Sequence, residues 1–414
     1  MIRNSLLQIG ACAMALASLA WLGGCKDPAA SGGGATAPAA GGAGATATGD
    51  EIKIGLVASQ GGDLRPWGQD CIAGARLAEA EINAAGGIGG KKIKLIVEDS
   101  NSKPEEGKSA AEKLASEGVI GLIGEVASGI TLQMKTVAMD RGLPLIAVGA
   151  TNPEVTKDSN GLVSRVCYTD DVQGPVMAFF AYNDLKLRKI AIMTDNKQPY
   201  SQGLSASFAK RFKELGGEIV GEEFYQSGEN QFGGQLTRIK SQNPDGIFMS
   251  GYFTEVGPMA RQIRQQGMTN VKLLGGDGWD STELTASGGD DIVGGYFCNH
   301  YNNAEDRPEV QDFLKKFREA NNGNDPGTTM AALGYDATML MIDALKRMDA
   351  AKATMDSATL AKTISETVDF PGVSGKITLM GKNGDPEKRA LVVQVTRTGQ
   401  EFVKAYEPSE VVAK

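Results

Sequence analysis

Residues 122–156 read LIGEVASGITLQMKTVAMDRGLPLIAVGATNPEVT, and this stretch predicts the architecture of the whole chain. Two short apolar runs, 119–123 and 145–148, enclose a segment with apolar residues on one helical face. This is the pattern of a strand, a helix and a second, parallel strand. A loop of small residues follows each run. Because open α/β sheets bind ligands beyond the carboxyl ends of their strands, we expect both loops to belong to a binding site.

The chemistry of the two loops favours a small carboxylate. The first loop opens a helix, whose free N–H groups and dipole attract negative charge. Ser128 stands at that helix start, and Thr151 lies in the second loop after Gly149 and Ala150. These residues alone are equally consistent with a simpler interpretation, in which Ser128 is an ordinary N-cap and Gly149-Ala150 an ordinary strand exit.

The composition excludes several classes of function. The 414 residues carry a formal net charge of -8, so we expect no nucleic-acid partner. His300 is the single histidine, which excludes a multi-histidine metal centre and leaves Ser-His-Asp or Cys-His catalysis without support. Cys298 and His300 are at most half of a metal site, and chance proximity on one strand explains them better. The sequence thus predicts neither an enzyme nor a metal or cofactor site.

Residues 1–25 have the features of a lipoprotein signal peptide. A basic start at Arg3 precedes an apolar core too short to span a bilayer, and the segment ends in LGGC at 22–25. This ending resembles a bacterial lipobox, so we expect Cys25 to carry a lipid anchor. Residues 26–50 are mostly Gly, Ala, Ser and Thr, a composition that predicts a flexible tether.

The sequence after residue 50 predicts two similar lobes. Strands alternate with helices from 51 to 168, and the same alternation returns between 169 and 299. Helical segments follow within 308–368, and small antiparallel strands are expected between 376 and 406. Helices placed so late must pack on an existing lobe, so at least one lobe is discontinuous. We predict an α/β protein with two doubly wound parallel-sheet lobes.

Cysteine usage allows at most one disulfide in the folded part. Cys71, Cys167 and Cys298 remain once Cys25 is lipidated, which is an odd number for an oxidising compartment. Cys167 and Cys298 lie on strands that leave or re-enter a lobe and form the better pair. Buried free thiols are equally consistent with the sequence.

Three segments resemble the periplasmic leucine/isoleucine/valine-binding proteins that serve ABC importers. They are EIKIGLVASQGGDLRPWGQDCIAGARLAEAEINAAGGIGGKKI, IGEVASGITLQMKTVAMDRGLPLIAVGATNPEVT and FMSGYFTEVGPMARQIRQQG. The resemblance covers residues 51 to about 406, and GATNPE together with INAAGGIGG is specific for the family. It implies the type I periplasmic binding protein fold, in which two lobes joined by a three-strand hinge close over an amino acid. The lobe boundaries that we expect are 51–168 with 300–374, and 169–299 with 375–414.

The resemblance also implies a set of ligand-binding residues. The family's carboxylate-binding serine matches Ser128, and its accompanying backbone and hydroxyl contacts match Gly149, Ala150 and Thr151. The aromatic residues of the family's pocket match Trp67, Tyr200 and Tyr252.

Asp277 matches the acid that holds the ligand's ammonium group in this family. The best-known members carry the longer glutamate there, so the aspartate requires a shifted backbone, a water or a different ligand pose. Without the resemblance, Asp277 between Gly276 and Gly278 has the features of a turn residue.

The resemblance predicts a solute-binding lipoprotein of the periplasm or cell envelope, anchored to the membrane through Cys25. Its expected ligand is an apolar, branched-chain type of L-amino acid, its expected partners are ABC importer permease subunits, and it is expected to be a monomer. Two alternatives stay open. The ligand could be a short amide, a urea-like compound or a small organic acid, or the chain could be a ligand-sensing module.

Overall fold

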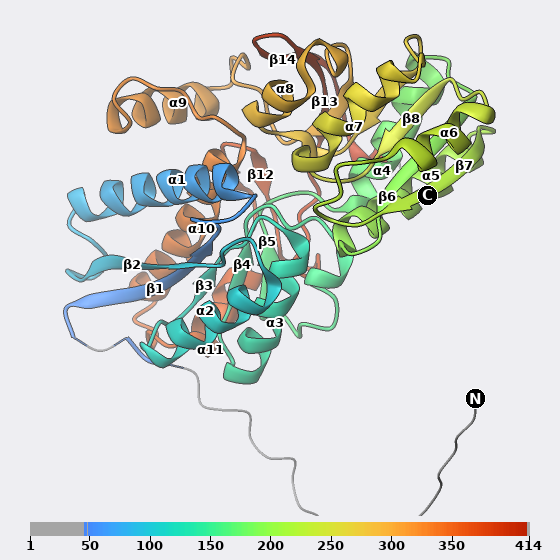
Figure 1. Cartoon of the computed structure of the whole chain (residues 1–414). Coiled ribbons are helices and arrows are strands. Elements are labelled where there is room, and N and C mark those ends of the chain that lie inside the picture. The colour runs from blue at the N-terminus through green and yellow to red at the C-terminus, as the bar shows by residue number, and fades with distance from the viewer. Residues whose placement is uncertain (1–44, 48, 412–414) are drawn as a thin grey trace, which may run out of the picture. The chain divides into compact units, whose positions relative to one another are not determined.

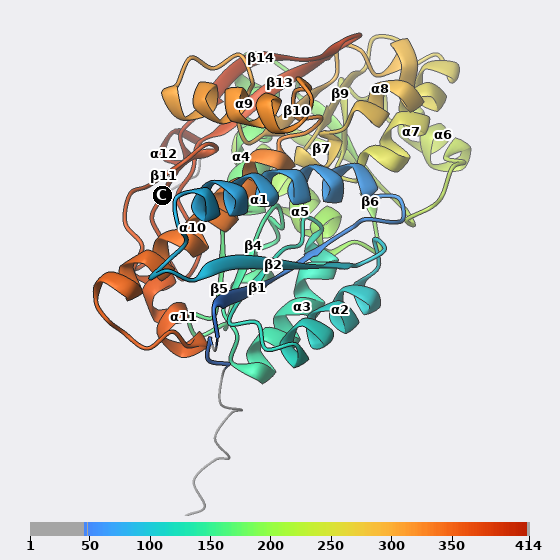
Figure 2. The same cartoon turned by 90° about the vertical axis from the view of Figure 1, so that its left-hand side faces the viewer.

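The computed structural model describes residues 45–47 and 49–411 (Figures 1 and 2). These described residues belong to one compact unit. The expected signal peptide, Cys25 and the tether up to residue 44 lie outside the described residues. Within the part of the chain that the structure describes, no helix is long and apolar enough to cross a membrane.

The last residues of the expected tether are attached to the folded part. Thr46 forms an antiparallel bridge with Asp356, and the amide of Ala47 donates to the carbonyl of Met355 over 2.9 Å. Ala47 also packs against the hydrophobic core. The prediction of a flexible tether over 26–50 was therefore wrong at its carboxyl end, where main-chain hydrogen bonds fix even small residues.

Parallel strands alternating with helices build the first sheet. Its elements are β1 (Glu51–Ala58), α1 (Arg65–Ala84), β2 (Lys92–Asp99), α2 (Pro104–Ser116), β3 (Leu122–Ile123), α3 (Ser128–Arg141), β4 (Leu145–Ala147), the short helix η1 (Pro153–Val155) and β5 (Val163–Arg165). The strand order is β2-β1-β3-β4-β5, and β1 and β2 pair from Glu51 opposite Lys92 to Ala58 opposite Asp99. Leu56 packs with residues of α1, whereas its neighbour Val57 packs with residues of α2 and α3. Residues 54–58 of β1, IGLVA, carry no polar side chain because helices cover both faces of the sheet.

The second sheet combines parallel strands with an antiparallel edge. Its elements are α4 (Asp170–Phe179), the π-helical turn η2 (Phe180–Asp184), β6 (Lys189–Asp195), α5 (Pro199–Glu214), β7 (Glu218–Tyr225), α6 (Gly233–Ser241), β8 (Gly246–Met249), α7 (Phe253–Gln265), β9 (Lys272–Gly275), η3 (Asp277–Trp279), α8 (Thr282–Gly288), η4 (Gly289–Asp291), β10 (Tyr296–Asn299), β13 (Ala390–Thr396) and β14 (Gly399–Tyr406). The strand order is β14-β13-β10-β9-β8-β6-β7. Strands β13 and β14 are the antiparallel strands expected late in the sequence.

The late helices within 308–365 pack beside the first sheet, and the short last helix contacts α4 of the second. The remaining elements are α9 (Pro308–Ala320), α10 (Met330–Ala350), α11 (Ser357–Ser365), β11 (Phe370–Gly372), β12 (Gly375–Ile377) and α12 (Pro408–Val411). Helix α10 runs beside α1 (Figure 2), and glycines permit the close approach. A Cβ on Gly74 would lie 1.8 Å from the carbonyl oxygen of Ala331, and one on Gly334 would lie 2.4 Å from that of Cys71.

The chain changes sheets three times: between β5 and β6, after β10, and between β12 and β13. This confirms the expected α/β fold with two sheets joined by a three-strand hinge. The residue boundaries expected for the two lobes, 51–168 with 300–374 and 169–299 with 375–414, stay a prediction.

The three cysteines of the described residues are free and buried. The candidate disulfide between Cys167 and Cys298 is therefore wrong, and the alternative of buried free thiols is confirmed. Burial raises the pKa of Cys167 to about 12, so its thiol stays protonated.

Candidate functional site

Loops that follow parallel strands of both sheets meet at one small cavity. The residues after β1, β4, β6, β8 and β9 that line it are Trp67, Gly149, Tyr200, Tyr252 and Asp277. The carboxyl ends of these strands therefore face a common space, as the ligand rule for open α/β sheets requires. The volume of the cavity is about 10 Å³, roughly the space of one water.

Three further residues complete the lining, and the sequence reasoning missed them. Val126 lies in the loop after β3, Gly278 follows Asp277 in η3, and Met330 is the first residue of α10. Val126 stands in the quoted stretch that was assigned to the site, but apolar character alone does not separate it from core residues. The position of Met330 depends on how α10 packs, which no local pattern indicates.

The aromatic side chains form one packed group. The rings of Tyr200 and Tyr252 stack with centroids 5.1 Å apart, and Trp67 meets Tyr252 edge-on at 5.1 Å. All three side chains are buried. The indole Nε1 of Trp67 donates to the backbone carbonyl of Asp280 over 2.7 Å, which orients the ring. Aromatic rings therefore form much of the cavity wall.

Asp277 is held by three hydrogen-bond donors. Its Oδ1 accepts from the Tyr200 hydroxyl over 2.9 Å and from the Gln173 side-chain amide over 3.0 Å. Its Oδ2 lies 3.0 Å from Nε2 of His300. The residue both begins the short helix η3, as the turn interpretation expected, and lines the cavity.

The residues expected at a carboxylate subsite lie mostly behind the cavity wall. Of the four, only Gly149 lines the cavity; Ser128, Ala150 and Thr151 are buried outside it. Ala127 is the N-cap of α3 and Ser128 is its first residue, so the interpretation of Ser128 as an ordinary N-cap is wrong. Its Oγ instead accepts from the amide of Asn152 over 3.2 Å and ties the two loops together.

Glu125 is a buried residue of the first loop that the sequence reasoning did not select. Its Oε2 accepts from the amides of Val126 and Ala127 over 2.7 and 2.9 Å. Its Oε1 accepts from the hydroxyls of Ser59 and Ser100 over 2.6 and 2.9 Å. The protein's own carboxylate thus takes two amides at the start of α3, and a ligand carboxylate is left with later donors of that turn.

Gln173 connects the two ends of the site. Its side-chain nitrogen donates to Asp170 over 2.9 Å and to Asp277 over 3.0 Å, and lies 3.3 Å from the Thr151 hydroxyl oxygen. Burial raises the pKa of Asp170 to about 7, and the charge of Asp277 adds to the rise. The Thr151 hydroxyl itself hydrogen-bonds the Asp170 carboxyl, which lowers the pKa of Asp170 against the effect of burial.

A sequence model of the periplasmic binding protein family matches residues 51–400. The chain belongs to this family. The Leu/Ile/Val-binding protein BraC3 of Rhizobium johnstonii is 30% identical over 335 residues, which are 81% of this chain and 89% of that protein.

Two solved structures are similar to this periplasmic binding protein over most of its length. The leucine-binding protein LivK of Thermotoga maritima is 34% identical with a TM-score of 0.81, and the match covers 87% of this chain and 99% of LivK. LivJ of Streptococcus pneumoniae, solved in complex with isoleucine, is 29% identical with a TM-score of 0.78, and the match covers 86% of this chain and 99% of LivJ.

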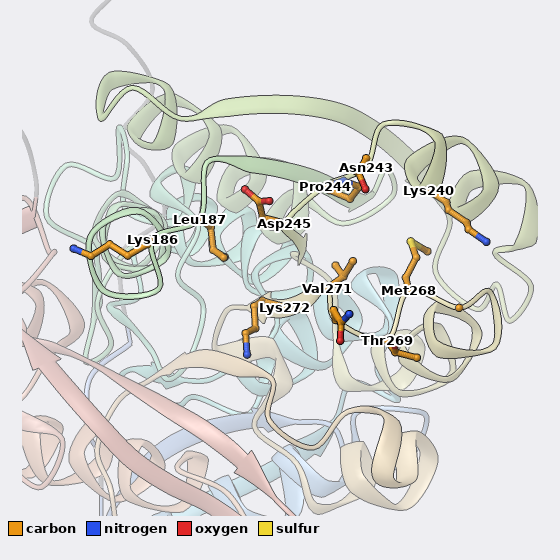
Figure 3. A pocket seen from close by; sticks show the side chains of 12 residues that line it. Lys186, Leu187, Lys240, Asn243, Pro244, Asp245, Met268, Thr269, Val271 and Lys272 are labelled. Carbon is orange, nitrogen blue, oxygen red and sulfur yellow. The ribbon is translucent and has the colours of Figure 1, made fainter.

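A larger hollow of this periplasmic binding protein lies at the opposite end of the second sheet. Figure 3 shows its lining, which precedes β6, β8 and β9, and the hollow has a volume of about 580 Å³. Lys186, Lys240 and Lys272 spread around it without converging on one point. Lys240 donates to the carbonyl of Gln266 over 2.7 Å, beyond the end of α7, as basic residues near helix ends commonly do. The hollow is therefore a surface feature of strand and helix ends.

No group of three His, Cys, Asp or Glu side chains that could hold a metal ion occurs among the residues that the structure describes. His300 is a buried partner of Asp277. This periplasmic binding protein therefore places its single histidine beside the candidate ligand site.

Proposed function

We propose that this protein captures an L-α-amino acid with an apolar side chain of the branched-chain type and delivers it to the permease subunits of an ABC importer. The observation that carries the proposal is the cavity, where one acid and three aromatic side chains from segments that follow strands of both sheets meet. The names of the relatives support it, since they bind leucine, isoleucine or valine, and LivJ was solved with isoleucine.

The charges around the cavity suit a zwitterion. Burying either end of an amino acid without a partner costs several kcal/mol. Asp277 supplies one negative charge for an ammonium group. For the carboxylate, we expect neutral donors from the start of α3 and from the nearby hydroxyls of Ser128 and Thr151, which favour a single negative group over a dianion.

The apolar wall suits an uncharged side chain. Trp67, Tyr200 and Tyr252 are buried and pack on one another, and Val126 and Met330 extend the wall. A charged ligand side chain would lose its hydration here without gaining a counter-charge. We therefore expect leucine, isoleucine and valine to bind in preference to lysine and glutamate.

Ligand entry requires the loops to separate, because an amino acid needs far more than the cavity's 10 Å³. The lining residues come from loops of both sheets, so the separation is an opening of one sheet layer from the other. Binding then shifts an equilibrium between open and closed forms.

A short amide, a urea-like compound or a small organic acid is the second candidate, and the contacts of Asp277 favour it. This side chain already accepts three hydrogen bonds, so a neutral N–H group could fill the remaining position. In that case Asp277 recognises a donor and not a charge.

We also propose that the protein works in the periplasm or cell envelope as a monomer attached to the membrane by a lipid on Cys25. The family membership supports the compartment, and the LGGC sequence at 22–25 supports the anchor.

Thermal unfolding with a series of ligands tests the proposed ligand class. A ligand at about a hundred times its dissociation constant should stabilise the fold by roughly 2.7 kcal/mol, which raises the melting temperature visibly. Leucine, isoleucine and valine should do so; lysine, glutamate and the α-keto acid of leucine should not. If the keto acid stabilises the protein as well as leucine does, the ligand is a small organic acid and not an amino acid. Mass spectrometry of small molecules released from the purified chain would identify the ligand independently.

A further inference from the structure

His300 directly follows β10 and is enclosed on all sides. It is 1% exposed, and its ring stacks on Tyr168 with centroids 4.1 Å apart and an interplanar angle of 23°. Nε2 lies 3.0 Å from Oδ2 of Asp277. The other nitrogen, Nδ1, is buried without a hydrogen-bond partner among the described residues. This pattern matches a neutral imidazole that carries its hydrogen on Nε2.

A ligand donor and His300 must share the same oxygen of Asp277. A carboxylate offers about four lone-pair positions. Tyr200 and Gln173 take both positions of Oδ1, and His300 takes one of Oδ2. The position that remains is therefore on Oδ2, beside the imidazole, and Asp277 itself lines the cavity.

We infer that His300 is a specificity-determining residue that decides, through Asp277, whether the site accepts a cationic ligand group. As a neutral imidazole it leaves the charge of Asp277 to the ligand's ammonium group. As an imidazolium it neutralises Asp277 itself, and two cations on one oxygen repel each other. Because linkage is reciprocal, protonation of His300 weakens amino-acid binding by the same factor as binding opposes protonation. The inference rests on the proposed function, since it needs an ammonium-bearing ligand.

Several titratable groups surround His300, and their protonation must be separated from its own. Asp277 faces Nε2 and Tyr168 faces the ring. Burial raises the pKa values of Tyr168 and Cys298 far above neutrality, so both stay uncharged. Burial also raises the pKa of Asp280, whose carboxylate accepts from Thr329 and Gln400.

Asp170 is the group most easily confused with His300. Burial raises the pKa of this carboxyl to about 7, and Gln173 connects it to Asp277. As the pH falls below 7, Asp170 also loses negative charge near the site. A variant that removes only one of the two groups distinguishes them.

The test compares the pH dependence of leucine affinity in the wild type, His300→Gln and Asp170→Asn, measured by calorimetry on the full chain. Glutamine can present an N–H near the position of Nε2 but never becomes charged. The wild-type dissociation constant should rise at least about 10-fold from pH 7.5 to 5.0, because a charged imidazole would compete with the ligand's ammonium group for Asp277. Asp170→Asn should keep most of this rise, and His300→Gln should lose most of it. If the dissociation constant rises by the same factor from pH 7.5 to 5.0 in the wild type and in His300→Gln, the inference is overturned.

A measurement on the wild type removes any dependence on how the variants fold. His300 is the single histidine of the chain, so labelled imidazole gives one set of nuclear magnetic resonance signals. At pH 5.5, saturating leucine should move these signals toward the neutral form. Leucine binding without such a change would overturn this inference alone. A wild type that fails to bind leucine at pH 7.5 would overturn the proposed function, and this inference with it.

Discussion

The indole Nε1 of Trp67 donates a hydrogen bond of 2.7 Å to the backbone carbonyl of Asp280. Trp67 belongs to α1 on the first sheet, and Asp280 follows η3 beside the second sheet, so the bond joins the two sheet layers. The side-chain amide of Asn152 makes a second such bond, over 2.7 Å, to the carbonyl of Pro199. Both bonds must break when the loops separate, so both contribute to the equilibrium between open and closed forms.

Replacing Asn152 by Asp should favour the open form. The change removes the donor to the Pro199 carbonyl but keeps the oxygen that accepts from the Glu154 amide over 2.9 Å. The new carboxylate also repels the carbonyl oxygen. Small-angle scattering of the unliganded variant should give a larger radius of gyration than the wild type, and ligand affinity should fall because closure is less favourable.

Asn83→Asp is a matched control for this closure prediction. The amide of Asn83 donates to the carbonyl of Ile93 over 2.8 Å, and its oxygen accepts from the Ile93 amide over 2.9 Å, all within the first sheet layer. Its radius of gyration and ligand affinity should stay at wild-type values. Equal radii for Asn152→Asp and the wild type would show that the Asn152–Pro199 bond does not hold the loops together.

Asp277→Asn should lose amino-acid binding. The substitution keeps the shape of the side chain but removes the charge that balances an ammonium group. Breaking a buried charge pair costs about 3–5 kcal/mol, which corresponds to a dissociation constant at least ~100-fold higher. Isothermal calorimetry with leucine measures the loss. Asp245→Asn, an exposed acid before β8, should bind leucine like the wild type. Undiminished binding by Asp277→Asn would favour the amide or organic-acid ligand.

The meeting of Trp67, Tyr200, Tyr252 and Asp277 around one cavity was expected from the resemblance to the leucine/isoleucine/valine-binding proteins. Strand periodicity adds that all four follow strands, and the carboxyl ends of parallel strands share an edge. The contact of His300 with Asp277 could not be expected, because Asp277 is 23 residues away and follows a different strand. The relation follows only from the strand order, in which β10 lies beside β9.

Other site features depend on contacts that no local pattern contains. Glu125 is buried by hydroxyls from Ser59 and Ser100, which are 66 and 25 residues away. Met330 reaches the cavity because α10 returns to pack on α1 after the chain has passed through the second sheet. Side-chain pairing and helix packing over such distances are decided by the tertiary fold.

Gly334→Ala should destabilise the first sheet layer. A Cβ at this position of α10 would lie 2.4 Å from the carbonyl oxygen of Cys71, so α1 and α10 would have to move apart. Overpacking of this kind costs about 1–3 kcal/mol or more. Gly234→Ala in α6 is the control, because its Cβ would meet Arg238 at an ordinary 3.7 Å, and it should be neutral or slightly stabilising. Equal urea denaturation midpoints for the two variants would contradict the close contact.

Cys25 should carry the membrane anchor. The thiol follows the small residues of LGGC, where a lipid can be attached, and residues 26–44 provide a spacer. Cells that express the chain and take up a fatty-acid analogue should yield labelled wild type and unlabelled Cys25→Ala. The variant should also disappear from the mature membrane-bound pool. Cys71→Ala, a buried thiol, should keep the label; an unlabelled wild type would rule out lipidation.

Lys388 should make stability rise with pH in the alkaline range. Its ammonium donates to the Val166 carbonyl over 2.6 Å and to Ser374, and burial lowers its pKa from 10.5 to about 8, although Asp336 opposes the shift. Below pH 8 Lys388 is protonated in both the folded and the unfolded chain, so the folded form bears the full cost of burying its charge. Between pH 8 and 10.5 the unfolded chain binds more protons, so raising the pH favours the folded form. Relative to Lys388→Met, the wild type should gain on the order of 1–3 kcal/mol across this range in urea denaturation. Lys352→Met, at a side chain that is 82% exposed, should show the same pH dependence of its unfolding free energy as the wild type. A difference in unfolding free energy between Lys388→Met and the wild type that stays constant with pH would refute the lowered pKa of Lys388.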